Sequence, residues 1–446
     1  MSTPSAPIDR ASANDLLQRA TDVGSVPMQV GAVLVLDDAG DIDLPAVRDA
    51  IERRTRAIPR LRRRLVDAPF GCGRPYWVDD ADFAIERHVR ALVCPRPGDE
   101  AALLAVATAV ATERLPDDRP LWSVTFVTGL ESGAGALFAV FHHVLADGIG
   151  GLAVLAGLVD GAPDDLPARQ LVTSQPGRRR LFGDATRARL QSLARVPSAV
   201  GLLRATVGEL RRSDVPKAAR CSLNRPTGPR RSLATARVDL APVVDVAHRH
   251  GATVNDIVLT AVAGALQATL HRRGEGLVPE FVITVPVSGR RATSATELGN
   301  DVSMRPVVVP ALGEPAERLV ATARRRPAPG DAASAASVAL LGPLFRLLAA
   351  LRLFRWFTER QRLVHTFVTN LRGPTEHLAF LGAQVRDVIP VSSISGNVTV
   401  AFAVLSYAGT LVVTVVADSD AWPDLASIQG DLQTELDVLV CAAQGR

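Results

Sequence analysis

The segment 135–159 constrains the fold most strongly, because a strand pattern, a turn and a helix pattern follow one another without interruption. "GALFAVFHH" (135–143) is apolar up to two adjacent histidines, and "GIGGLAVLAGLV" (148–159) has helical spacing. The turn between them reaches Asp147 and Gly148, and glycine there allows a tight backbone path. This order predicts a reactive imidazole held at the end of a rigid strand.

The remainder of the chain alternates between strand and helix patterns, which predicts an α/β protein. Strand patterns occupy 28–37, 74–80, 121–129, 280–288, 302–310, 365–370, 385–391, 397–407 and 410–418. Helical patterns occupy 44–56, 99–115, 253–273, about 314–364 and about 422–442. A Pro- and charge-rich stretch separates two halves of similar character. We therefore predict an N-terminal subdomain (1–165), a linker or crossover (166–232) and a C-terminal subdomain (233–446).

Composition narrows the classes of protein that fit. With 446 residues and 47% apolar residues, the chain has material for a large core and is globular rather than disordered. The net charge of +4 suits an Arg-rich surface, or attraction to phosphates on a coenzyme or on anionic lipid. The sequence has no basic tract interleaved with aromatic residues, so nothing in it indicates nucleic-acid binding. The four cysteines show no zinc-binding spacing and suggest reduced thiols in a cytoplasmic protein.

Neither a signal peptide nor a membrane-spanning segment is expected. The first residues lack a basic region followed by an apolar core, and no apolar run reaches the ~20 residues that cross a bilayer. The segment 344–362, "LFRLLAALRLFRWFTERQR", mixes Leu, Phe and Trp with arginines. It suits a helix that packs on the core with its arginines in water, and it also suits an interfacial helix against anionic lipid. Core packing is favoured, and peripheral contact with the inner membrane surface or a lipid droplet is kept as a hypothesis.

The pair His142-His143 has three interpretations. An imidazole near neutrality can take a proton from an alcohol or thiol and later return it, provided that its rotamer and tautomer are fixed. A single histidine after a strand is more often structural than catalytic. A metal site is the weakest interpretation, because neighbours on a strand point to opposite faces and no carboxylate cluster joins them. Asp147 is too close in sequence to be assumed the partner of either ring, and can instead hold the loop.

The sequence resembles a known family. HHxxxDG (142–148) is similar to the signature of CoA-dependent acyltransferases built like chloramphenicol acetyltransferase, which include peptide-synthetase condensation domains. Further matches, in order along nearly the whole chain, resemble the bacterial wax ester synthase/diacylglycerol acyltransferase family. They are "VPMQVGAVLVLD" (26–37), "PRLRRRL" (59–65), "RPYWVDDADFAIERHVR" (74–90), "RPLW" (119–122), "TVNDIVL" (253–259), "VPVSGR" (285–290), "ELGNDVS" (297–303), "TNLRGP" (369–374) and "VLSYAGTL" (404–411).

The resemblance implies two acetyltransferase-like subdomains with mixed sheets and an active-site channel between them. It also implies O-acyl transfer from a fatty acyl-CoA to diacylglycerol or a long-chain alcohol, giving triacylglycerol or wax ester. His143 would be the general base, His142 a supporting residue, Asp147 a structural aspartate and Gly148 the turn glycine. Acyl-CoA would be a co-substrate, with no permanently bound cofactor and no metal.

Three further residues are candidates on weaker grounds. Asn255 in "VNDIV" is either an oxyanion-site amide or the N-cap of the helix that follows, while Asp256 is expected to cap or to form an ion pair. Arg290 and Arg372 could bind CoA phosphates bidentately, although a solvated surface arginine is the more common case.

Alternatives to lipid O-acylation stay open from sequence. One is a specialised acyltransferase for a natural-product alcohol or amine, or for a carrier-protein thioester. Another, of a different class, is a non-catalytic acyl-CoA- or lipid-binding protein, against which the intact HHxxxDG argues. The family usually has PLWE where this chain has Ser123 after Trp122, which puts the acceptor in question.

Overall fold

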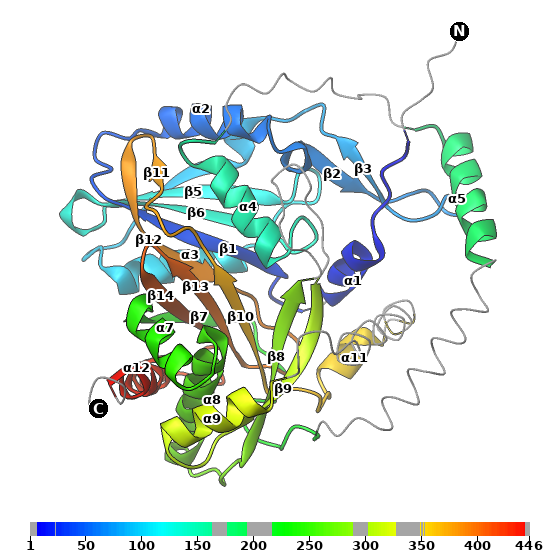
Figure 1. The fold of residues 1–446 in the computed structure, drawn as a ribbon. Coiled ribbons are helices and arrows are strands. Elements are labelled where there is room, and N and C mark those ends of the chain that lie inside the picture. Colours follow the sequence, from blue (N-terminus) through cyan, green and yellow to red (C-terminus); the bar gives the residue numbers. More distant parts are fainter. Residues whose placement is uncertain are drawn as a thin grey trace.

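The computed structural model describes residues 7–22, 24–162, 176–193, 216–288, 302–326, 348, 351 and 353–441. Within these residues, two six-stranded sheets carry helices on their faces, and a small two-stranded ribbon stands apart from both (Figure 1). Parallel and antiparallel neighbours occur in each sheet, so the expected mixed α/β architecture is confirmed.

The first sheet has the strand order β11-β12-β1-β6-β5-β4, and only the β4–β5 pair is parallel. Its strands are β1 (Gln29–Leu36), β4 (Val89–Val93), β5 (Trp122–Thr128), β6 (Gly135–His142), β11 (Ala379–Phe380) and β12 (Ala383–Val391). The separate ribbon pairs β2 (Arg63–Val66) with β3 (Tyr76–Asp79). β6 is buried along its whole length, which explains its unbroken apolar run up to the histidines.

The second sheet has the order β7-β14-β13-β10-β8-β9, and β10 runs parallel to both of its neighbours. Its strands are β7 (Arg231–Asp239), β8 (Glu280–Ser288), β9 (Val302–Pro310), β10 (Thr366–Arg372), β13 (Val400–Tyr407) and β14 (Thr410–Asp418). Three helices from the C-terminal half cover it: α8 (Val254–Arg272), α9 (Pro315–Arg324) and α12 (Leu425–Cys441). α8 is almost wholly buried among them, so its apolar residues extend all round the helix.

Two helices connect the sheets from opposite faces of β1. α3 (Glu100–Thr112) packs against alternate residues of β1, including Val33, and also contacts β7 of the second sheet. α4 (Gly148–Leu158) packs on the other face, where Leu34 points, and contacts β10. Because successive residues of a strand point to opposite faces of the sheet, β1 packs against α3 with one set of side chains and against α4 with the other.

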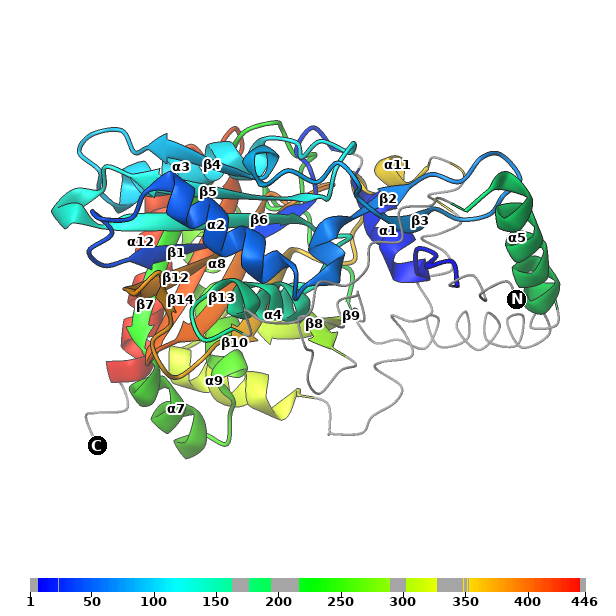
Figure 2. The same cartoon turned by 90° about the horizontal axis from the view of Figure 1, so that it is seen from above.

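The remaining helices lie toward the periphery. They are α1 (Ala13–Thr21), α2 (Leu44–Thr55), α5 (Arg178–Leu193), α7 (Leu240–Arg249) and α11 (Phe354–Thr358), with 3₁₀ turns at Pro59–Arg62, Ile85–Arg87 and Glu131–Gly133. α1, α11 and α5 lie at the same end of the molecule in both views, and α5 projects furthest (Figures 1 and 2). Within the described residues no single helix is long and apolar enough to cross a bilayer, although α7 and α8, bent by 98° at their junction, satisfy that test as a pair.

The chain crosses between the sheets after β10. It leaves the second sheet at Arg372, adds β11 and β12 to the edge of the first sheet, and returns to the second sheet in β13. Arg237 of β7 reinforces the junction by pairing with Asp387 of β12 at 2.7 Å and with Glu100 of α3 at 2.9 Å. The proposed boundaries near 165 and 233 stay a prediction, and the structure adds that residues 379–391 belong to the first sheet.

Candidate active site

The turn that follows β6 carries both histidines of the motif. His142 is the last residue of β6 and lies opposite Gln29 of β1, while His143 begins the turn. The ring of His142 is buried, with 7% of the residue exposed, whereas His143 is half-buried. The turn is closed by the N–H of Leu145, which donates to the carbonyl of His142 at 2.9 Å. The structure therefore separates the two histidines by environment, as expected for different roles.

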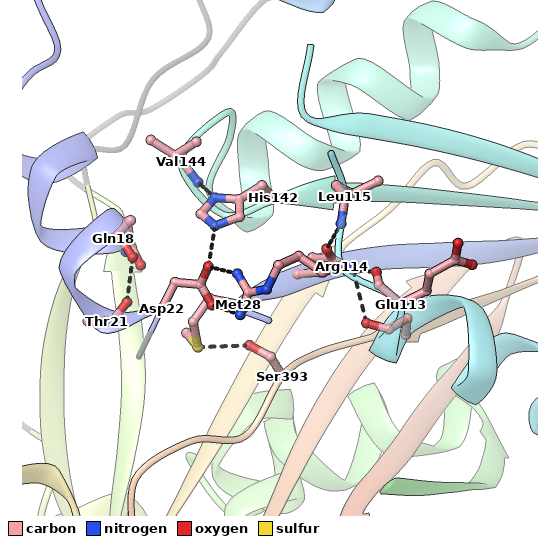
Figure 3. Close-up of polar contacts among 12 residues, drawn as sticks. Gln18, Thr21, Asp22, Met28, Glu113, Arg114, Leu115, His142, Val144 and Ser393 are labelled. Atoms are coloured by element: carbon pink, nitrogen blue, oxygen red, sulfur yellow. Dashed lines mark hydrogen bonds and ion pairs between the residues drawn. The ribbon is translucent and has the colours of Figure 1, made fainter. Parts of the chain in front are cut away.

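Both ring nitrogens of His142 are engaged by protein groups (Figure 3). Its Nδ1 accepts the backbone N–H of Val144 at 3.0 Å, and its Nε2 lies 3.4 Å from Oδ2 of Asp22. Because a backbone N–H can only donate, Nδ1 is unprotonated and the proton of the neutral ring sits on Nε2. His142 thus holds the turn in place, and its supporting role in the reaction stays a prediction.

Asp147 caps the helix that follows the turn. It is the N-cap of α4, 2% exposed, and its Oδ1 accepts the N–H of Gly150 at 2.8 Å. A carboxylate at this position also suits the positive end of the helix. The interpretation of Asp147 as a structural aspartate is consistent with this geometry.

Gly148 lets α4 approach the second sheet closely. A Cβ on this residue would lie 3.1 Å from a methyl carbon of Leu371 in β10, tighter than most side-chain contacts. The close approach brings the motif against the strand that also carries Asn370 and Arg372. The motif therefore lies at the junction of the two subdomains, where the channel was expected.

The interpretation of Asn255 as a helix N-cap is wrong. Thr253 is the N-cap of α8, and it forms a capping box with Asp256, as the hydroxyl–amide and carboxylate–amide bonds show. Thr253 takes the N-cap position because, in a capping box, the hydroxyl residue stands three residues before its acidic partner, here Asp256. Asp256 also pairs with Arg326 at 2.5 Å, so both roles expected of it are confirmed. The Oδ1 of Asn255 instead accepts the side-chain amide of Asn370 at 3.3 Å, linking α8 to β10.

A cavity of about 340 Å³ lies under α4, between the two sheets. Its lining is mainly apolar. Residues of α4 lie opposite residues of β1, β12 and β13, and the lining includes Leu34, Leu152, Leu155, Val388 and Leu405. Arg372, exposed to solvent, contributes to the lining together with Gly373 and Pro374. Arg290, the other proposed phosphate ligand, lies outside the described residues. Among the residues that the structure describes, no group of three or more His, Cys, Asp or Glu is placed to hold a metal ion.

Trp122 of the "RPLW" segment anchors the strand next to β6. It is buried, its indole N–H donates to the carbonyl of Leu61 at 2.7 Å, and its ring stacks on His88 at 4.4 Å between centroids. Ser123, where the family usually has a carboxylate, is half-buried on the opposite face of the strand and pairs in register with Val140. The tryptophan of this segment therefore supports the sheet that carries the histidines.

The buried ring of His88 makes the stability of the protein sensitive to acid. Burial lowers the pKa of His88 to about 4 from its ordinary value of 6.5, and its Nδ1 lies 2.9 Å from the carbonyl of Trp122. Between pH 6.5 and about pH 4, the imidazole of His88 binds a proton in the unfolded chain but stays neutral in the folded chain. Acidification in this pH range therefore favours unfolding. We expect the titration of His88 alone to lower the free energy of unfolding by about 2 kcal/mol when the pH falls from 7.5 to 5.

Denaturant titrations of the wild type and of a His88→Asn variant at both pH values measure this contribution. Asparagine keeps a donor for the Trp122 carbonyl but does not titrate. The free energy of unfolding of the wild type should fall further on acidification than that of the variant. Equal losses in the two proteins would contradict the assignment.

Sequence reasoning did not identify the groups that hold His142. Asp22 stands 120 residues before His142 in the sequence, at the end of a short helix, and Arg114 follows α3. No spacing rule connects positions so far apart, and only the fold brings them together.

The fold and the site together define a class of acyltransferase with two interlocked subdomains and HHxxxDG at their junction. Among solved structures, the wax ester synthase/diacylglycerol acyltransferase from Marinobacter aquaeolei VT8 matches with a TM-score of 0.70 at 23% identity, covering 98% of this chain and 100% of that one. The first condensation domain of the calcium-dependent antibiotic synthetase matches with a TM-score of 0.63 at 17% identity, covering 99% and 98%. At these identities the likeness concerns the fold.

Sequence comparison gives the family. Residues 12–258 match the wax ester synthase/diacylglycerol acyltransferase catalytic domain, and residues 298–439 match the C-terminal domain of that family. The chain is 31% identical over 439 residues to a probable diacylglycerol O-acyltransferase of Mycobacterium tuberculosis H37Rv, covering 96% of this chain and 95% of that one. A putative diacylglycerol O-acyltransferase of Mycobacterium bovis matches to the same extent.

The chain belongs to the wax ester synthase/diacylglycerol acyltransferase family. It is an acyl-CoA-dependent O-acyltransferase of the class that forms triacylglycerol or wax ester.

Proposed function

We propose that His143 is the general base of the transfer. The observation that supports the proposal is the engagement of both ring nitrogens of His142, by Val144 and Asp22, which favours its half-buried neighbour for the proton transfer. His143 takes the proton of the acceptor hydroxyl while that oxygen bonds to the thioester carbonyl carbon. The tetrahedral adduct then collapses, the C–S bond breaks, and the CoA sulfur leaves with the proton returned by His143.

We propose diacylglycerol as the acceptor, because the similar mycobacterial proteins are named as diacylglycerol O-acyltransferases. Acyl-CoA serves as a co-substrate, and the proposal includes no permanently bound cofactor. CoA release from a series of acyl-CoAs, crossed with diolein, hexadecanol and no acceptor, tests the pairing. Faster turnover with hexadecanol than with diolein would overturn the acceptor assignment while leaving the acyl transfer itself intact.

The cavity under α4 is proposed to hold part of the acyl chain. Its volume lies near the lower end of ordinary ligand sites, and an apolar lining stabilises a methylene chain by removing it from water. Arg372 remains a candidate for binding a CoA phosphate, since it is exposed and its guanidinium suits bidentate pairing. Dependence of CoA release on acyl length in the same series tests the cavity assignment.

We further propose that the protein works in the cytoplasm, in peripheral contact with the membrane surface through α11. Phe354 of this helix is buried, but the neighbouring Leu351, Leu353, Trp356 and Leu363 are exposed. Arg360 lies over the ring of Trp356, and the side chain of Arg355 is largely exposed. Tryptophan and leucine beside arginine form a composition that inserts shallowly into anionic lipid. α1, which precedes Asp22, contacts α11, so this surface lies close to the motif.

Replacing Leu353 by serine should weaken binding to vesicles that contain anionic lipid. We expect about a threefold or larger loss in the partition coefficient, because a partly buried leucine side chain contributes roughly 1 kcal/mol on leaving water. Flotation with vesicles measures the bound fraction. Leu277→Ser is the matched control, since Leu277 is also exposed, at 63% against 45% for Leu353, and lies in the segment between α8 and β8. Equal partitioning of both variants would rule out α11 as the contact.

A further inference from the structure

The carboxylate of Asp22 gathers three donors next to the motif (Figure 3). Asp22 follows α1 directly, and only 10% of its side chain is exposed. Its Oδ2 accepts Nε2–H of His142 at 3.4 Å and Nη1 of Arg114 at 2.5 Å. Its Oδ1 accepts the backbone N–H of Met28 at 3.1 Å and Nη2 of Arg114 at 3.4 Å. Arg114 therefore spans both oxygens, while His142 and Met28 each bond to one.

These bonds reach the turn along two separate routes. The first runs through the ring of His142, whose Nδ1 accepts the N–H of Val144 only while Nε2 holds the proton that Asp22 accepts. The second runs through Met28, which donates its N–H to Asp22 and accepts the N–H of His143 at its carbonyl, at 3.0 Å. One carboxylate is thereby linked to the backbone around His143 in two ways, through the ring of His142 and through the backbone of Met28.

The surroundings keep this carboxylate charged and fixed. Burial alone would raise the pKa of Asp22, but hydrogen bonds from His142 and Arg114 outweigh it and lower the pKa to about 2. Arg114 is itself held, because the buried side chain of Gln29 accepts the N–H of Leu115 at 2.9 Å and donates to the carbonyl of Glu113 at 2.9 Å. These bonds fix the backbone on both sides of Arg114, whose side chain is 54% exposed and reaches Asp22 from the surface.

We propose that Asp22 is a positioning residue for acyl transfer. It fixes the tautomer of His142 and, through His142 and Met28, the place of the His143 imidazole. The inference rests on the proposed role of His143 as the base. A displacement of a catalytic group by about 1 Å can cost on the order of 100-fold in rate, so a group that sets this position should influence turnover without touching the substrate.

An Asp22→Asn variant tests the inference. Asparagine keeps the size but offers only one accepting oxygen, so it cannot accept His142, Arg114 and Met28 together. We expect kcat with palmitoyl-CoA and diolein to fall at least about 10-fold, with KM for palmitoyl-CoA within about twofold. The matched control is Asp67→Asn, since Asp67 pairs with Arg19 of α1 at 2.6 Å but is exposed and distant in sequence from the turn. Its kcat should equal that of the wild type.

Histidine ¹⁵N NMR adds a readout that a merely structural role would not move. The wild type should show Nδ1 of His142 unprotonated, with the signal assigned by its loss in His142→Gln, and Asp22→Asn should shift it. Unchanged kcat with a shifted signal overturns the inference, and so does an unchanged signal.

Asp22→Glu, which keeps the charge but moves it by one methylene, replaces the asparagine variant if that variant fails to fold, with the same expected losses. If His143→Ala is inactive while Asp22→Asn is fully active, this inference fails alone; if His143→Ala is active, the proposed base fails instead.

Discussion

His143→Ala should lose at least about 100-fold in kcat, because a positioned general base contributes roughly 10² to 10⁴ to the rate of a proton transfer. Alanine removes the imidazole but leaves the backbone N–H that donates to the carbonyl of Met28. The turn, the capped α4 and the His142–Asp22 contact should therefore persist. CoA release from palmitoyl-CoA with diolein measures the loss.

The control for this variant is His271→Ala. His271 is exposed at the end of α8, far along the chain from the turn, so its removal should leave kcat unchanged. Thermal unfolding of both variants should match that of the wild type. Undiminished transfer by His143→Ala would remove the base from the proposed mechanism, even though the family assignment would stand.

Local patterns predicted most of the elements well. The Val-rich and alternating stretches became β1, β8, β9 and β14 within a residue or two of the expected bounds. Asp99, expected near the start of a helix, is the N-cap of α3 and accepts the N–H of Ala102. Elements with weak local signals were missed, namely α1, β2, β4, β7, β11 and α7. The long helical region expected over about 314–364 is represented by α9 and α11, and most of the segment between them lies outside the described residues.

Non-local pairing explains what the sequence could not predict. β12 reads as an ordinary strand, yet it pairs with β1 in the other half of the chain, across several hundred residues of sequence. The hydrophobic periodicity of a strand indicates which of its faces is buried, but it does not indicate which strand pairs with it. The same limit hid the site: HHxxxDG was visible, but Asp22 reaches His142 only because α1 folds back over the end of β6. The histidine motif was thus local in sequence, and the residues that contact it were not.

A buried ion pair in the second subdomain should give the largest change in stability. The side chain of Arg318 is 3% exposed, and it donates to Glu435 of α12 at 2.6 Å and to the carbonyl of Thr260 of α8 at 2.9 Å. Gly264 makes room for the pair, because a Cβ there would lie 2.3 Å from the Glu435 carboxyl group. Three helices, α8, α9 and α12, therefore meet at one charge pair.

Removing only one partner should be far worse than removing both. Glu435→Leu leaves the Arg318 guanidinium buried without its counter-charge, and we expect a loss of about 3 to 5 kcal/mol in the free energy of unfolding. The double variant Arg318→Met/Glu435→Leu buries no charge and should recover at least half of that loss. Denaturant titration of the two single variants, the double variant and the wild type completes the cycle. Asp118→Asn, at an exposed pair with Arg87, is the control and should leave the free energy of unfolding nearly unchanged. If the double variant were as unstable as Glu435→Leu, the loss would come from packing of α12 and not from the stranded charge.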